Sequence, residues 1–179
     1  MTNIFLNIDL FQTINEYTDL RSFCDTCRSF ATLKKYVNYK LNKEYSLMYY
    51  DDVLFRNIVL SKIFNPNKQL RLDLGGCNKI TDVSALRNVH TLDLQGCKNI
   101  TDVSALGNVH TLNLQDCDNI TDVSALGNVH NLCLYGCKNI TDVSALGNVH
   151  TLNLQGCESI TDVSALGNVH TLFLTSLCT

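Results

Sequence analysis

Apolar and polar positions follow one fixed pattern over most of this chain, in blocks of twenty residues. The hexapeptide Thr-Asp-Val-Ser-Ala-Leu begins at Thr81 and returns at residues 101, 121, 141 and 161 without an insertion. The repeat covers the sequence from about Leu70 onward, and residues 1–69 do not share it. A constant period of this length is typical of a solenoid, in which each block forms one coil, or rung.

One block shows which side chains a rung should bury. Its apolar positions are Val109, Leu112, Leu114, Cys117, Ile120, Val123 and Leu126. Leu112 and Leu114 alternate with polar residues, as in a strand with one buried face. A single rung buries too little apolar surface to offset the entropy lost by ordering its backbone. Stacked rungs can pair their strands and share apolar columns, so the pattern predicts a parallel sheet along one side of a solenoid.

The motif Val-x-x-Leu-x-Leu-x-x-Cys-x-x-Ile at residues 109–120 carries a family resemblance. It recurs at residues 89–100, 129–140 and 149–160, and it resembles the constant segment of cysteine-containing leucine-rich repeats. The Ile-Thr-Asp-Val-Ser-Ala-Leu that follows is similar to the short convex segment of internalin-type repeats. The resemblance implies an α/β leucine-rich-repeat solenoid with about five repeats and six strands, and with extended or 3₁₀ turns opposite the sheet.

Residues 1–69 form a different region, in which apolar residues recur at helical spacing. A helix is predicted over residues 52–64, with an apolar face made by Val53, Leu54, Ile58 and Ile63. The first rung has no neighbour before it, so these helices are predicted to form a small N-terminal cap on the solenoid. We therefore divide the chain into a helical region at 1–45, a cap or linker at 46–69, and the repeats at 70–179.

The stretch from Ile8 to Leu33, with Asp-Leu-Arg-Ser-Phe-Cys-Asp-Thr-Cys-Arg-Ser-Phe-Ala-Thr-Leu at its centre, resembles an F-box. F-boxes attach substrate receptors to the Skp adaptor of a cullin ubiquitin ligase. The resemblance implies that the adaptor contacts are Leu10, Ile14, Tyr17, Leu20, Cys27 and Phe30. Asp9 and Tyr17 depart from the usual proline and leucine, and a plain helical cap is the alternative. Such helices joined to near-identical repeats are also similar to the repeat proteins of giant DNA viruses.

Charge and hydropathy argue against several classes of partner. Residues 1–69 hold nine Lys and Arg against seven Asp and Glu, and residues 70–179 hold five against ten. Neither part is basic enough to predict binding to nucleic acid. No apolar run approaches the ~18 residues of a membrane span, and the first ten residues lack a signal-peptide pattern. We expect a cytoplasmic protein without membrane contact, in the host cytoplasm if the chain is viral.

The nine cysteines fall into two groups that invite different chemistry. One column of the repeat holds Cys77, Cys97, Cys117, Cys137 and Cys157, where we expect buried free thiols in a reducing compartment. Cys24 and Cys27 form a Cys-x-x-Cys pair in the N-terminal region. A zinc site needs four ligands, and no second pair lies at the usual spacing, so we interpret both as structural residues.

Histidine and aspartate each fill another column. The histidines are His90, His110, His130, His150 and His170, and stacked rungs would place them about 4.8 Å apart. Two adjacent rings could hold a metal ion, but the neighbouring Val and Thr positions offer no further ligand. A solvated edge is therefore the favoured interpretation, and no metal or cofactor is predicted. The aspartates from Asp82 to Asp162 are predicted to cap the next turn, with a calcium ladder as the less favoured alternative.

The outward face of the sheet is the predicted binding surface, because its side chains are not needed for packing. The candidate residues are Asp93, Gln95, Asn113, Gln115, Asn131, Cys133, Tyr135, Asn153, Gln155 and Phe173. Most rungs repeat Thr, Asn or Asp, and Gln on this face, whereas the rung at residues 127–146 brings Cys133 and Tyr135 together. An aromatic group among amides can anchor a partner, although drift between duplicated copies would leave the same pattern.

A near-identical ladder presents the same residues everywhere, so unlike groups do not converge as they must in an active site. No glycine elbow surrounds the repeated serines and no phosphate-binding loop is found, so we expect no enzyme activity. Two hypotheses remain, both centred on binding to protein. The chain is either an F-box-type substrate receptor of a ubiquitin ligase or a stand-alone leucine-rich-repeat binding or scaffold protein. Leu177 replaces the cysteine of the last rung, which predicts an incomplete end and a weak homodimer through it.

Overall fold

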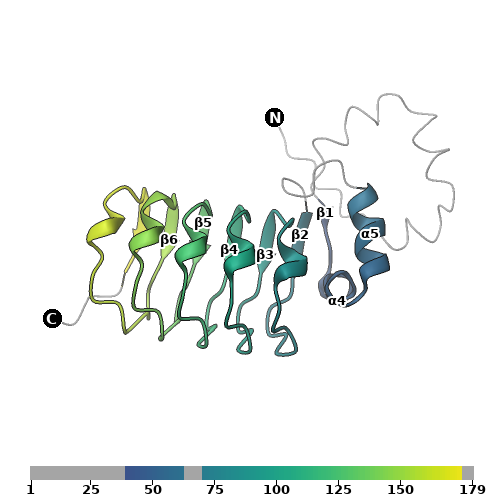
Figure 1. Ribbon diagram of the computed structural model, residues 1–179, viewed down its shortest axis with the longest axis horizontal. Helices are drawn as coiled ribbons and strands as arrows, with labels where there is room; N and C mark the ends of the chain where they lie inside the picture. The colour runs from purple at the N-terminus through teal and green to yellow at the C-terminus, as the bar shows by residue number, and fades with distance from the viewer. Residues whose placement is uncertain (1–38, 63–69, 175–179) are drawn as a thin grey trace, which may run out of the picture.

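The computed structural model describes residues 39–62 and 70–174, which stack as a row of coils with one parallel sheet (Figure 1). The sheet has seven strands in chain order: β1 (Tyr39–Lys40), β2 (Leu70–Asp73), β3 (Thr91–Asp93), β4 (Thr111–Asn113), β5 (Asn131–Cys133), β6 (Thr151–Asn153) and β7 (Thr171–Phe173). From β2 onward the strands pair at steps of twenty residues, so that Leu112 lies beside Leu92 and Leu132. The in-register pairing confirms the predicted solenoid, and β2 to β7 are its six expected strands.

Short 3₁₀ turns run opposite the sheet in the described rungs, as the repeat predicted. They are η2 (Ser84–Leu86), η3 (Ser104–Leu106), η4 (Ser124–Leu126), η5 (Ser144–Asn148) and η6 (Ser164–Leu166). The aspartate column initiates these turns. The Ser124 N–H donates to Oδ1 of Asp122 at 2.8 Å, and the other four rungs repeat this bond at the same distance. These N–H bonds lower the pKa of each carboxyl, so the predicted capping role is confirmed.

The core consists of the apolar columns that the repeat predicted. All seven apolar side chains of the central rung, from Val109 to Leu126, are at most 1% exposed. The thiols of the cysteine column are buried and free. From Cys97 onward they donate to carbonyl groups of the preceding rung, as from Cys117 Sγ to Leu94 O at 3.2 Å. Burial raises the pKa of Cys117 to about 12 and that of Cys157 to about 11. The prediction of buried free thiols in this column is confirmed, whereas Cys24 and Cys27 lie outside the described residues.

Within residues 39–62, a strand and two helices precede the first rung. Strand β1 pairs in parallel with β2 and was not predicted. Helix α4 (Lys43–Asp51) begins where Asn42 Oδ1 accepts the Tyr45 N–H at 2.9 Å, and helix α5 (Val53–Lys62) follows it. Asp52 separates the helices because its Oδ1 accepts the N–H groups of Leu54 and Phe55. The expected boundary between residues 45 and 46 falls inside α4.

The predicted apolar face of the second helix is wrong. Val53, Leu54 and Ile58 are 58%, 74% and 43% exposed, and Ile63 lies outside the described residues. Phe55 and Val59, four residues apart, are buried in their place. Asp52 fixes the start of α5, and Arg56 donates to the backbone oxygens of two α4 residues, Tyr49 and Tyr50, at 2.9 and 2.6 Å. These contacts with α4 set the rotation of α5, which no pattern within the helix itself reveals.

Helix α4 packs directly against the first rung. Ser46 Oγ accepts the Asp73 N–H at 3.0 Å, and Lys43 Nζ donates to the Gly75 carbonyl at 2.6 Å. Lys79 forms an ion pair with Asp51 at the end of the helix. Leu41 and Tyr49 join the core of the solenoid. Helix α4 and strand β1 therefore cover the first rung, as the predicted cap requires, and α5 packs on α4. None of the helices in the described ranges is long and apolar enough to cross a membrane.

Candidate protein-binding surface

The solenoid brings all ten predicted binding residues to the open face of the sheet or its immediate edge. Gln95, Tyr135 and Phe173 are exposed there, and the other seven side chains are half-buried. The six predicted adaptor contacts, Leu10, Ile14, Tyr17, Leu20, Cys27 and Phe30, lie outside the described residues. The open face is therefore the part of the predicted site whose geometry can be followed.

Several polar side chains on this face hold the backbone that follows their strand. Oδ1 of Asp93, Asn113 and Asn153 accepts the N–H of the residue two positions later, at 3.0 Å each. Asn113 Nδ2 also donates to Asp93 Oδ1 at 3.1 Å, and Asn131 Nδ2 donates to Thr111 Oγ1 at 3.2 Å. The expectation that this face is not needed for packing is thus wrong for these residues, because each has a local structural task.

The rung at residues 127–146 differs in having Cys133 where its neighbours have Asn113 and Asn153. Burial raises the pKa of the Cys133 thiol, and a hydrogen bond with the Tyr135 N–H partly opposes that shift. Tyr135 is 42% exposed, and Phe173, two strands away at the same position as Cys133, is 47% exposed. Tyr135 and Phe173 give an otherwise polar face an aromatic end.

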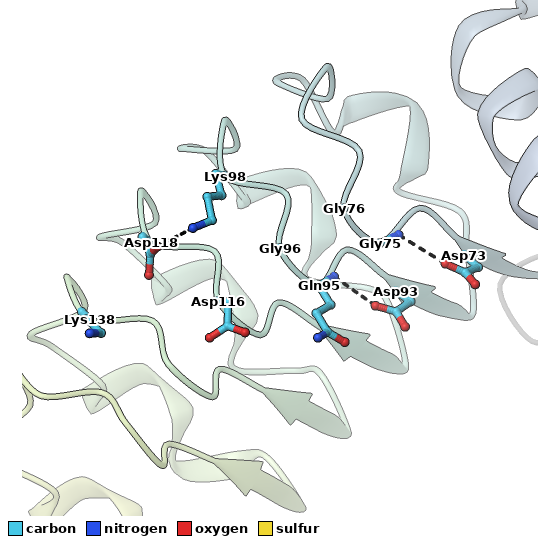
Figure 2. A pocket seen from close by; sticks show the side chains of 10 residues that line it. All are labelled: Asp73, Gly75, Gly76, Asp93, Gln95, Gly96, Lys98, Asp116, Asp118 and Lys138. Atoms are coloured by element: carbon cyan, nitrogen blue, oxygen red, sulfur yellow. Dashed lines mark hydrogen bonds and ion pairs between the residues drawn. The ribbon is translucent and has the colours of Figure 1, made fainter.

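A shallow groove of about 660 Å³ borders this face along the loops that follow the strands (Figure 2). Its lining residues are Asp73, Gly75, Gly76, Asp93, Gln95, Gly96, Lys98, Asp116, Asp118 and Lys138. Figure 2 shows Lys98 pointing toward Asp118, and their charged atoms are 3.5 Å apart. Sequence reasoning missed this groove. The signal was present at residues 116 and 118, where aspartates replace the glycine of the other rungs and the lysine of two of them, Lys98 and Lys138.

Asp116 occupies a backbone conformation that favours glycine. Its φ is +56°, and the equivalent Gly76, Gly96, Gly136 and Gly156 have φ between +68° and +75°. Because the left-handed region costs a side-chain-bearing residue about 1–2 kcal/mol, we expect Asp116→Gly to raise the free energy of unfolding by roughly 0.5–1 kcal/mol. Urea denaturation measures this change.

The control for Asp116→Gly is Gly96→Ala. A Cβ at Gly96 would meet only the Gly76 Cα, at 4.0 Å, so this variant reports the backbone cost without a clash. It should lower the free energy of unfolding by about 1 kcal/mol. If Asp116→Gly is destabilising instead, the hydrogen bond from Gln115 Nε2 to Asp116 Oδ2, at 3.1 Å, outweighs the strain.

A column of asparagines links neighbouring rungs through the loops that follow the cysteine column. It was not predicted from the sequence. Asn99, Asn119 and Asn139 each donate from Nδ2 to a backbone carbonyl of the preceding rung, at 2.6 to 2.7 Å. The acceptors are Asn78, Lys98 and Asp118. The recurrence of asparagine before isoleucine was a visible signal for this ladder.

Comparison with known proteins agrees with the repeat architecture. A family model described as "Leucine Rich repeat" matches residues 85–107. No curated protein matches the chain. The chain folds as a leucine-rich-repeat solenoid. Its in-register parallel strands, its 3₁₀ turns and its leucine, isoleucine and cysteine columns are the features of that fold.

Two internalins of Listeria monocytogenes are among the similar solved structures. Internalin inlF is 29% identical with a TM-score of 0.46, and the match covers 60% of this chain and 34% of that protein. Internalin C2 (inlC2) is 22% identical with a TM-score of 0.37, and the match covers 63% of this chain and 66% of that protein. The leucine-rich-repeat solenoid described here thus spans about a third of the first internalin and under two thirds of the second.

The histidine column forms a continuous stack beside the sheet of the solenoid. From His90 to His170 the neighbouring ring centroids are 4.5 to 4.7 Å apart, with interplanar angles of 20° to 34°. Burial lowers the pKa of His110, helped by His130 and Arg71. Burial also lowers the pKa of His150, helped by His130 and His170. Burial is the larger cause of both shifts, and the charge of neighbouring rings adds to it.

This stack predicts that the solenoid loses stability between pH 7 and pH 5. A base whose pKa is lower in the folded state binds protons more readily when unfolded. Stability should fall as the pH drops below the unfolded histidine pKa, near 6.5, and the loss should be complete below the folded pKa. The aspartate caps have linkage of the same sign at lower pH, because their stabilisation is also lost as the pH falls through their lowered pKa values.

Urea denaturation at pH 7 and pH 5 measures the expected loss. Replacing His110, His130 and His150 with glutamine should flatten the dependence on pH. A variant with the same pH dependence as the wild type would show that the stack does not couple protonation to folding.

Proposed function

We propose that this chain is a protein-binding module that recognises its partner with the open face of the sheet and has no catalytic role. The observation that carries the proposal is Tyr135, an exposed aromatic side chain on a face of half-buried amides. Tyrosine buries a large area at a small entropic cost and is enriched among the residues that dominate binding energy. Phe173 extends the aromatic area toward β7, and the carboxylates of the groove lie toward β2.

These two areas define the chemistry of the partner. An apolar or aromatic group would pack on Tyr135 and Phe173, and basic side chains would face Asp73, Asp93 and Asp116. The repeat also supplies a conservative variant for the test. The rungs with Gln95, Gln115 and Gln155 have glutamine at the position of Tyr135, and they have aspartate or asparagine at that of Cys133. The variant Cys133→Asn with Tyr135→Gln therefore keeps the repeat pattern while removing the anchor.

The experiment compares captured proteins for the wild type and three variants by quantitative mass spectrometry. A true partner should be lost with Cys133→Asn/Tyr135→Gln and weakened by Asp93→Asn. It should be retained with Thr121→Ala, a change at an exposed residue opposite the sheet. Truncating a dominant aromatic contact costs about 2 kcal/mol or more, so the loss should exceed tenfold for that partner. If every captured protein survives the double variant, the open face is not the binding surface.

We propose further that the N-terminal region attaches this module to a Skp-type adaptor, so that the sheet selects a substrate for ubiquitin transfer in the cytoplasm. The support for this step is the F-box resemblance of residues 8–33, and the reduced thiols of the core are compatible with that compartment. Co-purification with a purified Skp adaptor tests it. Ile14→Lys with Leu20→Lys should abolish co-purification, and Cys133→Asn/Tyr135→Gln should not.

An adaptor that never co-purifies, or that tolerates the lysine variant, would leave the stand-alone binding or scaffold role. The weak homodimer expected through the last rung stays a prediction, because residues 175–179 lie outside the described residues. Phe173 is exposed on β7. Light scattering of a Phe173→Lys variant would test whether this side chain contributes to the homodimer.

A further inference from the structure

The histidine stack has chemistry that protein binding by the sheet does not use. His110, His130, His150 and His170 are exposed, and all five rings follow one another at 4.5 to 4.7 Å. Within the described ranges, no three metal-ligating side chains gather into one site. Any ion held here would therefore be bound by two neighbouring imidazoles and by water.

We propose that adjacent rings in the centre of this stack, with His130 and His150 as the principal pair, bind a divalent late transition-metal ion such as Zn²⁺, Ni²⁺ or Cu²⁺. Imidazole nitrogen is a preferred ligand for these ions. Two nitrogens on one tetrahedral ion are about 3.3 Å apart, given metal–nitrogen bonds of about 2.0–2.1 Å. The His130 and His150 centroids are 4.5 Å apart, so small rotations of two exposed rings bring their outer nitrogens into range.

Threonine hydroxyl groups support the required orientation of two rings in the stack, one of which, His150, belongs to the principal pair. Nδ1 of His110 and His150 lies 3.2 and 3.3 Å from the hydroxyl of Thr111 and Thr151. A hydrogen bond from Nδ1–H to that hydroxyl leaves the lone pair of Nε2 directed toward solvent. Metal-binding histidines commonly have their second nitrogen fixed in this way.

The geometry of the stack places the principal pair at His130 and His150. Their ring centroids are the closest of the stack, at 4.5 Å, and their interplanar angle of 20° is the smallest, whereas the other neighbouring rings lie 4.6 to 4.7 Å apart at 30° to 34°.

The test uses the full chain without an affinity tag, titrated with NiCl₂ or ZnCl₂ at pH 7.5 in a calorimeter. Two double variants retain the same number of histidines and differ only in adjacency. His90→Gln/His170→Gln keeps three neighbouring rings, whereas His110→Gln/His150→Gln leaves three rings that are never adjacent. The first should bind as the wild type does. The second should bind at least about tenfold more weakly. Loss of a residue that only hydrogen-bonds to a metal ligand already weakens metal binding by about tenfold or more, and this variant loses a ligand itself.

Equal binding by the two variants would overturn the proposal, because the metal would then be held by other groups such as cysteines. Absence of binding by the wild type would also overturn it. Circular dichroism checks that both variants fold. A nitrogen NMR spectrum of the wild type with Zn²⁺ provides a test without mutation, in which Nε2 of His130 and His150 should shift more than Nδ1. A shift confined to other histidines would contradict the assignment.

Discussion

Removal of residues 107–126, one complete rung, should leave a folded solenoid that is one strand shorter. Each group that loses a partner finds the same partner one rung earlier. Asn139 would donate to the Lys98 carbonyl that Asn119 now uses, and Leu132 would pair with Leu92 in place of Leu112. The deletion also removes Asp116 and its positive φ. Because each rung contacts only its neighbours, the free energy of unfolding should fall by about the contribution of one rung and of one interface between rungs.

The matched control removes half as many residues, 107–116. This deletion eliminates β4 but retains η4, so two turns follow each other with no strand between them. Strand β5 can then no longer continue the sheet from β3, and the apolar columns are interrupted. We expect loss of the cooperative melt seen by circular dichroism. The urea m-value is proportional to the surface that unfolding exposes. In the complete-rung variant it should therefore be lower by the share that one rung contributes. An unfolded complete-rung variant, or a cooperative half-rung variant, would contradict the independence of the rungs.

The period of twenty residues predicted most of the solenoid because one coil contains nearly all the interactions that define it. The buried columns, the 3₁₀ turns, the aspartate caps and the thiol column all depend on residues within a rung or one rung away. The same spacing sets the histidine rings beside one another, which adds to the effect of burial in lowering the pKa of His110 and His150. A local pattern repeated at a fixed step therefore determines both the fold and the long-range ladders.

The features that were missed depend on contacts that the period does not encode. The inward face of α5 is set by Asp52 and Arg56 through their contacts within the cap. The strand β1 is too short to carry an alternating pattern. The groove arises from loop geometry, including the positive φ of its glycines. The alternating pattern marks the open-face amides as outward-facing, but it does not show their hydrogen bonds to backbone N–H groups and to side chains of the preceding rung.

Leu114→Ala should lower the free energy of unfolding by about 2–5 kcal/mol, the range for truncating a fully buried leucine. Leu114 is 0% exposed, and it stands in a column between Leu94 and Leu134, which are also 0% exposed. The Leu114 carbonyl accepts from Cys117 N–H and from Cys137 Sγ, so the surrounding backbone is held on both sides. These bonds limit collapse into the cavity, which favours the upper half of the range.

The control is Leu174→Ala, at the equivalent position of the last described rung. Leu174 is half-buried, so the truncation removes less contact and leaves no enclosed cavity. Its cost should be less than half that of Leu114→Ala, as urea denaturation of both variants will show. Hydrogen exchange distinguishes the two further, because Leu114→Ala should weaken protection on both sides of β4, whereas Leu174→Ala should affect the rungs near β7. Equal costs for the two variants would mean that the last rung is as well covered as the central one, and the open end inferred for β7 would then be wrong.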